Sequence, residues 1–322
     1  MKTTLNQTNL SVTPICLGTV NFGSSLPHAD SIRQLDEYTD IGGNFIDTAH
    51  IYGDWNPGDG PLSEAVIGKW LNQRGKRSSV VISTKGAHPN VATMHVPRFS
   101  NAEIQEDLDD SLRTLNTDYI DLYFLHRDDV SRPVEEIIEF LELNVKAGKI
   151  RYYGCSNWKL ERIKEANAYA KSRGFQGFSC NQLMWSLADI TFDGLMDKSF
   201  VLMDDYTYDY HAQIGLNVMA YSSIAKGYFP RRHNNETLAK DITDVYENDV
   251  NENIYSVLQD ACVENPSAIT DYPIRYLIDS HPFPSVAIVS FDNIQQLKEN
   301  MGSLEADINE EIMQRIISFK NQ

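Results

Sequence analysis

The chain has 322 residues and a formal net charge of −17, from 45 acidic and 28 basic side chains. Its 42% hydrophobic and 23% charged residues are ordinary for a globular protein with a sizeable core. Nucleic acids and anionic membranes are bound by basic surfaces, so this charge balance argues against both classes of partner. No apolar run approaches the roughly 20 residues of a membrane span, and the N-terminal residues have no pattern of a secretory signal.

The four cysteines, Cys16, Cys155, Cys180 and Cys262, lie far apart in the sequence. This spacing favours small buried residues in a reducing compartment over a disulfide framework or a zinc site. We therefore expect a cytoplasmic protein.

Segments typical of strands and helices alternate along almost the whole chain. In chain order the predicted strand and helix pairs are 15–18 and 29–41, 45–47 and 63–73, 80–82 and 104–115, 119–125 and 134–147, 151–155 and 160–172, 175–180 and 200–214, 216–220 and 254–262, and 285–289 and 294–300. A last helix is predicted over 308–319. Ser100 and Glu103 have the spacing of a capping box before the third helix.

Eight strand–helix units without a linker predict an α/β fold with a parallel sheet. Their total length is that of a closed (β/α)8 TIM barrel. We expect one domain over residues 1–322, with long loops at one end of the barrel and an extra C-terminal helix. The loops are 86–99 and 226–253, and the second is expected to be extended and partly mobile.

Four polar residues follow the apolar strands, namely Asp47, Tyr52, Lys85 and His126. In a barrel of parallel strands these side chains meet at the carboxyl end, where such barrels place their chemistry. Tyr52 is a candidate general acid for a carbonyl oxygen, and Lys85 is expected to lower its pKa from about 10. Asp47 would keep the lysine charged, and His126 would bind the carbonyl oxygen or relay a proton. Because protonation alone reduces nothing, a hydride-donating cofactor is also required.

The motifs around these residues resemble those of the aldo-keto reductase family. The matching stretches are 17–19, 44–49 with 52–53, 83–85, 122–126, 149–157, 181–182, 220–222 and 296–300, in the family's order. The resemblance implies an NADP- or NAD-dependent barrel enzyme that reduces an aldehyde or ketone, a small-molecule carbonyl substrate, to the alcohol. It implies no metal, and it does not indicate an oligomeric state.

Residue by residue, the resemblance places the family's catalytic residues on Asp47, Tyr52, Lys85 and His126. Contacts to the cofactor are implied for Gly18, Thr19, Asp47, Ser156, Asn157, Gln182, Tyr221, Ser222, Ile224, Lys226, Ser290, Gln296 and Asn300. Of these, Ser156, Asn157 and Gln182 match the residues that hold the nicotinamide carboxamide, and Tyr221 matches the aromatic residue on which the ring stacks. Ser222, Ile224 and Lys226 match the pyrophosphate segment.

The predicted substrate-binding residues are Asn21, Tyr52, Trp55, His88, His126, Arg127 and Asp128. Their polar character favours a hydroxylated compound such as a sugar-derived carbonyl. The segment 290–296 contains no basic residue and one acid, although a basic residue is the usual partner of a phosphate. The choice between NADPH and NADH therefore stays open. Two alternatives also remain: a redox-sensing, cofactor-binding regulatory subunit, and a metal-dependent barrel hydrolase with a cluster of His50, His88 and His126.

Overall fold

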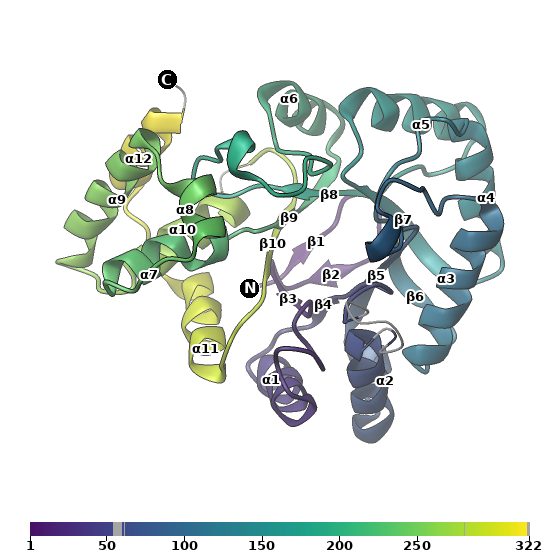
Figure 1. The fold of residues 1–322 in the computed structure, drawn as a ribbon, viewed down its shortest axis with the longest axis horizontal. Coiled ribbons are helices and arrows are strands. Elements are labelled where there is room, and N and C mark those ends of the chain that lie inside the picture. Colours follow the sequence, from purple (N-terminus) through teal and green to yellow (C-terminus); the bar gives the residue numbers. More distant parts are fainter. Residues whose placement is uncertain (54–59, 61, 280, 321–322) are drawn as a thin grey trace.

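A closed barrel of eight parallel strands forms the centre of the molecule (Figure 1). The computed structural model describes residues 1–53, 60, 62–279 and 281–320. Around the barrel, the strands are β3 (Ile15–Gly18), β4 (Phe45–Asp47), β5 (Val81–Gly86), β6 (Ile120–Leu125), β7 (Ile150–Ser156), β8 (Cys180–Met184), β9 (Asn217–Tyr221) and β10 (Ser285–Val289). Strand β10 pairs with both β9 and β3, which closes the barrel. The predicted (β/α)8 fold is confirmed.

Helices connect successive strands and cover the outside of the barrel (Figure 1). The first six connecting helices are α1 (His28–Asp40), α2 (Leu62–Arg74), α3 (Asn101–Thr114), α4 (Val134–Lys146), α5 (Leu160–Ser172) and α6 (Asp205–Ile214). The predicted capping box opens α3, because Ser100 Oγ accepts from the backbone N–H of Glu103 and the Glu103 carboxylate accepts from the N–H of Ser100. Helices α11 (Ile294–Gly302) and α12 (Glu310–Lys320) follow β10, and α12 is the expected extra C-terminal helix.

A short antiparallel hairpin closes the amino end of the barrel. It consists of β1 (Thr3–Thr4) and β2 (Ser11–Val12). Leu5, Leu10 and Val12 are buried in one hydrophobic cluster with side chains from inside the barrel, including Phe124 of β6. The Oδ1 atom of Asn217, at the start of β9, accepts a hydrogen bond of 2.7 Å from the backbone N–H of Asn6. The carboxyl end is therefore the open end of the barrel.

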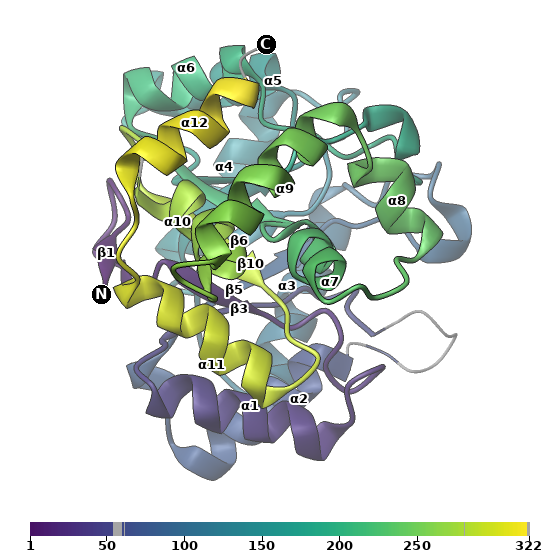
Figure 2. The same ribbon diagram turned by 90° about the vertical axis from the view of Figure 1, so that its left-hand side faces the viewer.

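The segment after β9 is largely helical, so the prediction of an extended loop over 226–253 is wrong. It contains α7 (Tyr228–His233), α8 (Lys240–Tyr246) and the start of α9 (Asp249–Cys262). Together with α10 (Ala268–Asp279), these helices lie beside the barrel (Figure 2). The difference arises because the few apolar residues between the many charged ones pack into the core. Tyr228, Phe229, Ile242, Val245 and Tyr246 are all buried.

Two further elements differ from the sequence-based prediction. The sixth strand begins at Cys180 rather than at 175, because Gly154 of β7 pairs with Cys180 and Ser156 pairs with Gln182. Asn181 and Gln182 are polar, so this strand does not have the apolar sequence from which a buried strand is predicted. Helix α10 was missed because it contains Pro273, a residue that usually interrupts helices. Among the described residues, no helix is long and apolar enough to cross a membrane.

Candidate active site

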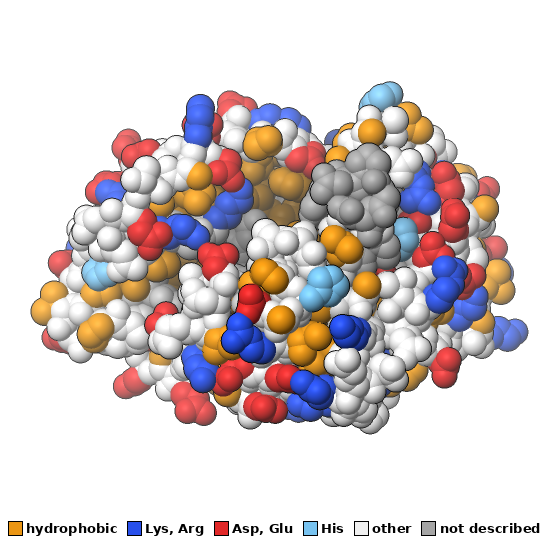
Figure 3. All heavy atoms as spheres, turned by 60° about the horizontal axis from the view of Figure 1, so that its bottom comes forward, with side chains coloured by type: hydrophobic (Ala, Val, Ile, Leu, Met, Phe, Trp, Pro, Cys, Tyr) orange, Lys and Arg blue, Asp and Glu red, His pale blue; other side chains and the backbone are white. Residues whose placement is uncertain are grey.

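A cavity of about 910 Å³ opens at the carboxyl ends of the barrel strands. Figure 3 shows the molecular surface hollowed between hydrophobic and basic side chains. Seventeen predicted site residues line the cavity: Gly18, Thr19, Asp47, Tyr52, His88, His126, Arg127, Ser156, Asn157, Gln182, Tyr221, Ser222, Ile224, Lys226, Ser290, Gln296 and Asn300. The structure therefore brings together most residues that the sequence motifs singled out.

Lys85 lies behind the cavity wall and connects two of the predicted catalytic residues. Its Nζ atom donates hydrogen bonds of 2.7 Å to Oδ2 of Asp47 and 2.7 Å to the backbone carbonyl of Thr48. A longer hydrogen bond of 3.4 Å joins Nζ to the phenolic oxygen of Tyr52. The Asp47 and Lys85 side chains are almost completely buried, while Tyr52 is half-buried at the cavity surface.

Two neutral donors hold the carboxylate of Asp47 in place. Ser83 Oγ donates to Asp47 Oδ1 over 2.7 Å, and Gln182 Nε2 donates to the same oxygen over 3.0 Å. Ser83 lies on β5 two residues before Lys85, so both side chains point to the same side of the strand. No role was predicted for Ser83, although it lies in the matching stretch 83–85, because it has no titratable group.

Burial and the neighbouring charges together determine the pKa values of Tyr52 and Lys85. Burial raises the pKa of Tyr52 above its ordinary value of 10.0, while Lys85 opposes this rise and Asp47 adds to it. The expectation that Lys85 would bring this pKa below its ordinary value is wrong, because desolvation of the phenolate outweighs the attraction of the ammonium. For Lys85, burial disfavours the charge, but Asp47 and Tyr52 outweigh it and raise its pKa. The site thus holds a protonated phenol beside a charged ammonium.

Two histidine rings and an arginine form one wall near Tyr52. The ring centres of His88 and His126 are 4.7 Å apart, and Nδ1 of His88 donates to the Pro89 carbonyl over 2.7 Å. Burial lowers the pKa of His88 to about 4, and burial, His88 and Arg127 together lower that of His126 well below its ordinary value. Both imidazoles are therefore neutral near pH 7. Arg127 is held by Asp197, 3.1 Å away.

Polar side chains at the ends of β7 and β9 also line the cavity. Asn157 Oδ1 accepts hydrogen bonds of 2.6 Å from the Tyr221 hydroxyl and 3.2 Å from the backbone N–H of Val201. Its Nδ2 donates to Ser156 Oγ over 3.1 Å. Asn157 has a φ of 58°, in the left-handed region that asparagine tolerates better than most residues. This backbone turn directs the amide into the cavity wall.

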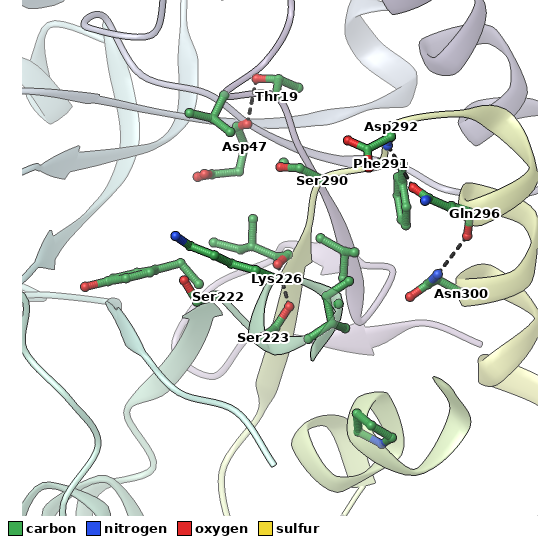
Figure 4. A pocket seen from close by; sticks show the side chains of 18 of the residues that line it. Thr19, Asp47, Ser222, Ser223, Lys226, Ser290, Phe291, Asp292, Gln296 and Asn300 are labelled. Carbon is green, nitrogen blue, oxygen red and sulfur yellow. Dashed lines mark hydrogen bonds between the residues drawn. The ribbon is translucent and has the colours of Figure 1, made fainter. Parts of the chain in front are cut away.

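The cavity continues to the segments 222–227 and 290–300 (Figure 4). At Gly18, a Cβ atom would lie only 2.7 Å from Ser290 Oγ, so glycine is required for the close approach of β3 and β10. Asn300 Nδ2 donates to the Gln296 carbonyl over 2.8 Å. Its buried Oδ1 has no hydrogen-bond partner in the described part of the chain, as expected of an atom that meets a ligand. Lys226 is paired with Asp241.

Three predicted substrate-binding residues are placed differently. Asn21 does not line the cavity, and its Nδ2 donates to the Phe291 carbonyl over 3.2 Å. Asp128 also lies outside the lining and is paired with Arg162 at 3.1 Å. Trp55 lies outside the described residues.

Several lining residues were not among the predicted site residues. They are Val20, Ile51, Phe200, Ser223, Gly227, Phe229, Pro230, Arg231, Asn234, Glu236, Ile269, Thr270, Pro273, Ile288, Val289, Phe291, Asp292, Asn293 and Glu299. Many of them lie on the helices after β9 or in the loops beside these helices. The misinterpretation of this region as an extended loop is why its contribution to the cavity was missed.

The histidines proposed for a metal cluster are divided between two places. His88 and His126 meet edge to face in the cavity. The ring nitrogens of His50, in contrast, each lie 3.8 Å from a carboxylate, one of Asp107 and the other of Asp110. Within residues 1–53, 60, 62–279 and 281–320, no group of three or more His, Cys, Asp or Glu side chains is arranged to hold a metal ion.

Comparison with known proteins places almost the whole chain in one family. Residues 14–321 match the Aldo/keto reductase family. The chain belongs to this family. It is therefore an NAD(P)-dependent oxidoreductase that acts on small-molecule carbonyl compounds.

The similar proteins include bacterial and fungal oxidoreductases. The chain is 31% identical to an uncharacterized oxidoreductase, YrpG, of Bacillus subtilis, over 98% of this chain and 94% of that protein. It is 26% identical to an aryl-alcohol dehydrogenase [NADP(+)] of Phanerodontia chrysosporium, over 95% of this chain and 82% of the relative. A norsolorinic acid reductase of Aspergillus flavus is 35% identical, but over only 55% of this chain and 47% of the relative.

Among solved structures, a thermostable aldo-keto reductase crystallised with the inhibitor epalrestat has the same fold. The TM-score is 0.74, the sequence identity is 22%, and the match covers 99% of each chain.

Proposed function

We propose that this aldo-keto reductase reduces its carbonyl substrate with a proton from Tyr52. The observation that carries the proposal is the buried pair of Asp47 and Lys85, with the phenolic oxygen of Tyr52 lying 3.4 Å from Lys85 Nζ at the cavity surface. When bound, the nicotinamide cofactor supplies the hydride from C4 to the carbonyl carbon. Tyr52 protonates the carbonyl oxygen as negative charge develops on it. Lys85 stabilises the phenolate that remains.

His126 is proposed to orient the carbonyl oxygen rather than to supply the proton. Its low pKa keeps the imidazole neutral, and a neutral imidazole carries a hydrogen on one ring nitrogen. Nδ1 of His126 is buried without a partner among the described residues. In the tautomer with its hydrogen on Nε2, the Nε2–H group can donate a hydrogen bond to the substrate oxygen.

The residues that line the cavity fit a dinucleotide. Its volume of about 910 Å³ lies toward the upper end of the range for ligand pockets, and Asn300 Oδ1 is a buried acceptor without a described partner. We assign the carboxamide to Ser156, Asn157 and Gln182, and the stacking face of the ring to Tyr221. Gly18, Thr19, Ser222, Ile224, Lys226, Ser290, Gln296 and Asn300 complete the proposed cofactor site.

An aromatic aldehyde or ketone is the substrate class that the wall beside Tyr52 favours. Phe200 and His88 present rings to the cavity, and Val20 and Ile51 add apolar surface. Flat aromatic substrates pack well against such side chains. Two similar proteins are named aryl-alcohol dehydrogenases.

A sugar-derived carbonyl is the second candidate, because Arg127 and His88 also line the cavity and can bind hydroxyl groups. Asn21 and Asp128, which suggested a sugar from the sequence, lie outside the cavity lining. A panel of aryl aldehydes and aldoses, compared by kcat/KM, separates the two classes.

Replacement of Tyr52 by Phe tests the proton-donor assignment. We expect Tyr52→Phe to lower carbonyl reduction by about 100- to 10,000-fold, while nucleotide affinity, measured by quenching of protein fluorescence, stays nearly unchanged. Tyr206, which is 79% exposed, provides the matched control, and Tyr206→Phe should keep full activity. If Tyr52→Phe retains turnover, the assignment fails. Tight nucleotide binding without turnover of any carbonyl would indicate the regulatory role instead.

A further inference from the structure

The end of the cavity that lies away from Tyr52 has an unusual charge arrangement. If hydride is delivered beside Tyr52, as the proposed function requires, the nicotinamide half of the cofactor lies at that end of the cavity. The adenosine half then has to lie at the other end, which α7, α10, α11 and the segment 290–293 enclose. Figure 4 shows Asp47 on one side of the cavity and Asp292, Gln296 and Asn300 on the other.

Arg231 lies at this far end and is shared by two carboxylates. Its guanidinium lies 3.3 Å from a carboxylate oxygen of Glu236 and 3.2 Å from one of Asp292. Glu299 also lines this part of the cavity. The described lining here therefore has one arginine facing three carboxylates.

The other basic side chains of the neighbourhood are also paired with acids. Lys226 pairs with Asp241, Arg232 with Glu252 and Lys298 with Glu37. Of these three, only Lys226 lines the cavity. The surroundings of the adenosine half are therefore acidic, even though several basic residues are nearby in the sequence.

NADPH and NADH differ at one position of the adenosine ribose, where NADPH has a phosphate and NADH a hydroxyl. The phosphate carries a charge of about −1.5 to −2 near pH 7 and needs cations that are free to donate hydrogen bonds to it. A hydroxyl, in contrast, donates well to a carboxylate, and carboxylates recognise ribose hydroxyls in other dinucleotide sites. Placing the phosphate among these three acids would add like-charge repulsion.

The position of Asp292 suits contact with a ribose. Its backbone N–H donates to Gln296 Oε1 over 2.9 Å, which fixes this turn against the start of α11. Its side chain is 67% exposed, so the carboxylate is accessible from the cavity. We propose that Asp292 and Glu236 make this enzyme selective for NADH, by accepting hydrogen bonds from the ribose and by neutralising Arg231.

Binding of NADH and NADPH to the full chain, followed by fluorescence, tests this inference directly. The wild type should bind NADH at least about tenfold more tightly than NADPH, and added salt should reduce the difference because it screens the repulsion. The double variant Asp292→Asn with Glu236→Gln removes two negative charges and frees Arg231. Its affinity for NADPH should be at least about tenfold higher than that of the wild type.

A third substitution and a control complete the experiment. Adding Arg231→Gln to the double variant should abolish the gain in NADPH affinity, because no free cation then faces the phosphate. Glu252→Gln removes a similar charge from a residue that does not line the cavity, and it should leave the NADH to NADPH ratio unchanged. Thermal melting of each variant checks that these exposed substitutions preserve the fold.

The result that overturns the inference is a wild type that binds NADPH as tightly as NADH, or an affinity ratio that the double variant leaves unchanged. Because affinities are measured without turnover, the inference is tested separately from the chemistry. Loss of carbonyl reduction with an intact preference for NADH would contradict only the proposed function. Absence of binding by either nucleotide would overturn both.

Discussion

The ammonium nitrogen of Lys85 lies 2.7 Å from Oδ2 of Asp47, and the two side chains are 0% and 2% exposed. A buried ion pair is stable only when its remaining hydrogen-bonding groups are also satisfied. Here the Thr48 carbonyl accepts from Lys85, and Ser83 and Gln182 donate to Asp47. The pair is therefore part of the core of the protein as well as of the proposed active site.

Substitution of Lys85 by Met should lower both stability and activity. It leaves the Asp47 carboxylate buried without its partner, which typically costs about 3 to 5 kcal/mol of unfolding free energy. Urea unfolding measures this loss. The double variant Lys85→Met with Asp47→Asn should regain much of the stability but none of the activity, which separates the two roles.

Lys298→Met is the control for this experiment, because Lys298 forms a partly exposed pair with Glu37 at 2.9 Å. Exposed pairs contribute about 1 kcal/mol or less. Equal stability of the Lys85→Met and Lys298→Met variants would contradict the prediction.

The pH dependence of the reaction should reflect the raised pKa of Tyr52. Reduction needs the protonated phenol, so kcat/KM for the carbonyl should stay level through neutral pH and decline only above pH 10, the ordinary value of a tyrosine. Oxidation of the alcohol needs the deprotonated phenol and should accelerate as pH increases. Steady-state kcat/KM, measured as a function of pH in both directions with saturating cofactor, tests these two dependences. A decline of reduction near pH 7 would show that another group donates the proton.

Acid should destabilise the protein through two histidines outside the site, the buried His211 and the half-buried His281. Burial lowers the pKa values of His211 and His281 to about 4 each, from 6.5. Between these values the unfolded chain binds more protons than the folded chain, so stability decreases as pH falls from 6.5 toward 4. Each histidine should contribute about 1 to 3 kcal/mol to this loss.

Urea unfolding at several pH values tests the acid effect. His211→Gln should flatten the dependence of the unfolding free energy on pH between 6.5 and 4. His28 is exposed, so His28→Gln should leave the slope as in the wild type. A slope that does not change in the His211 variant would exclude this histidine as a cause.

Much of the barrel could be predicted because its strands are short apolar runs that end in polar residues of definite type. Asp47 and His126 follow such runs directly, and the regular alternation with helices determined the topology. The sixth strand could not be located correctly, because Asn181 and Gln182 are polar although both are buried in the barrel. Burial of polar residues depends on hydrogen-bond partners from distant strands, which a local pattern does not reveal.

The far half of the cavity was harder to predict than the half that surrounds Tyr52. Arg231 and Glu236 come from a segment so rich in charge that it was interpreted as a loop. The contact of Arg231 with Asp292 joins positions 61 residues apart and depends on how the helices after β9 pack. The net effect of burial on Tyr52 was equally hidden, since a sequence gives the neighbouring charges but not the degree of desolvation.

A glycine in helix α2 should be intolerant of alanine, although alanine favours helices. A Cβ atom at Gly68 would lie 2.1 Å from the Thr114 carbonyl oxygen, so α2 or α3 would have to move. We expect Gly68→Ala to destabilise the protein by about 1 to 3 kcal/mol, as overpacking does.

Gly302, in α11, has no described atom within 4 Å of the corresponding Cβ position. Gly302→Ala should be neutral or stabilising by up to about 1 kcal/mol. Thermal or urea unfolding compares the two variants. Similar stability of both would show that α2 and α3 can separate without cost.

The hairpin of β1 and β2 has a kinetic consequence. Because Leu5, Leu10 and Val12 close the amino end of the barrel, the entrance for reactants and the exit for products that the described residues leave is the mouth at the carboxyl end. Whatever occupies the deeper position beside Asp47 must then arrive before its co-reactant and depart after it. Three aliphatic side chains that close the amino end of the barrel would thereby impose a compulsory order of binding and release on the two reactants.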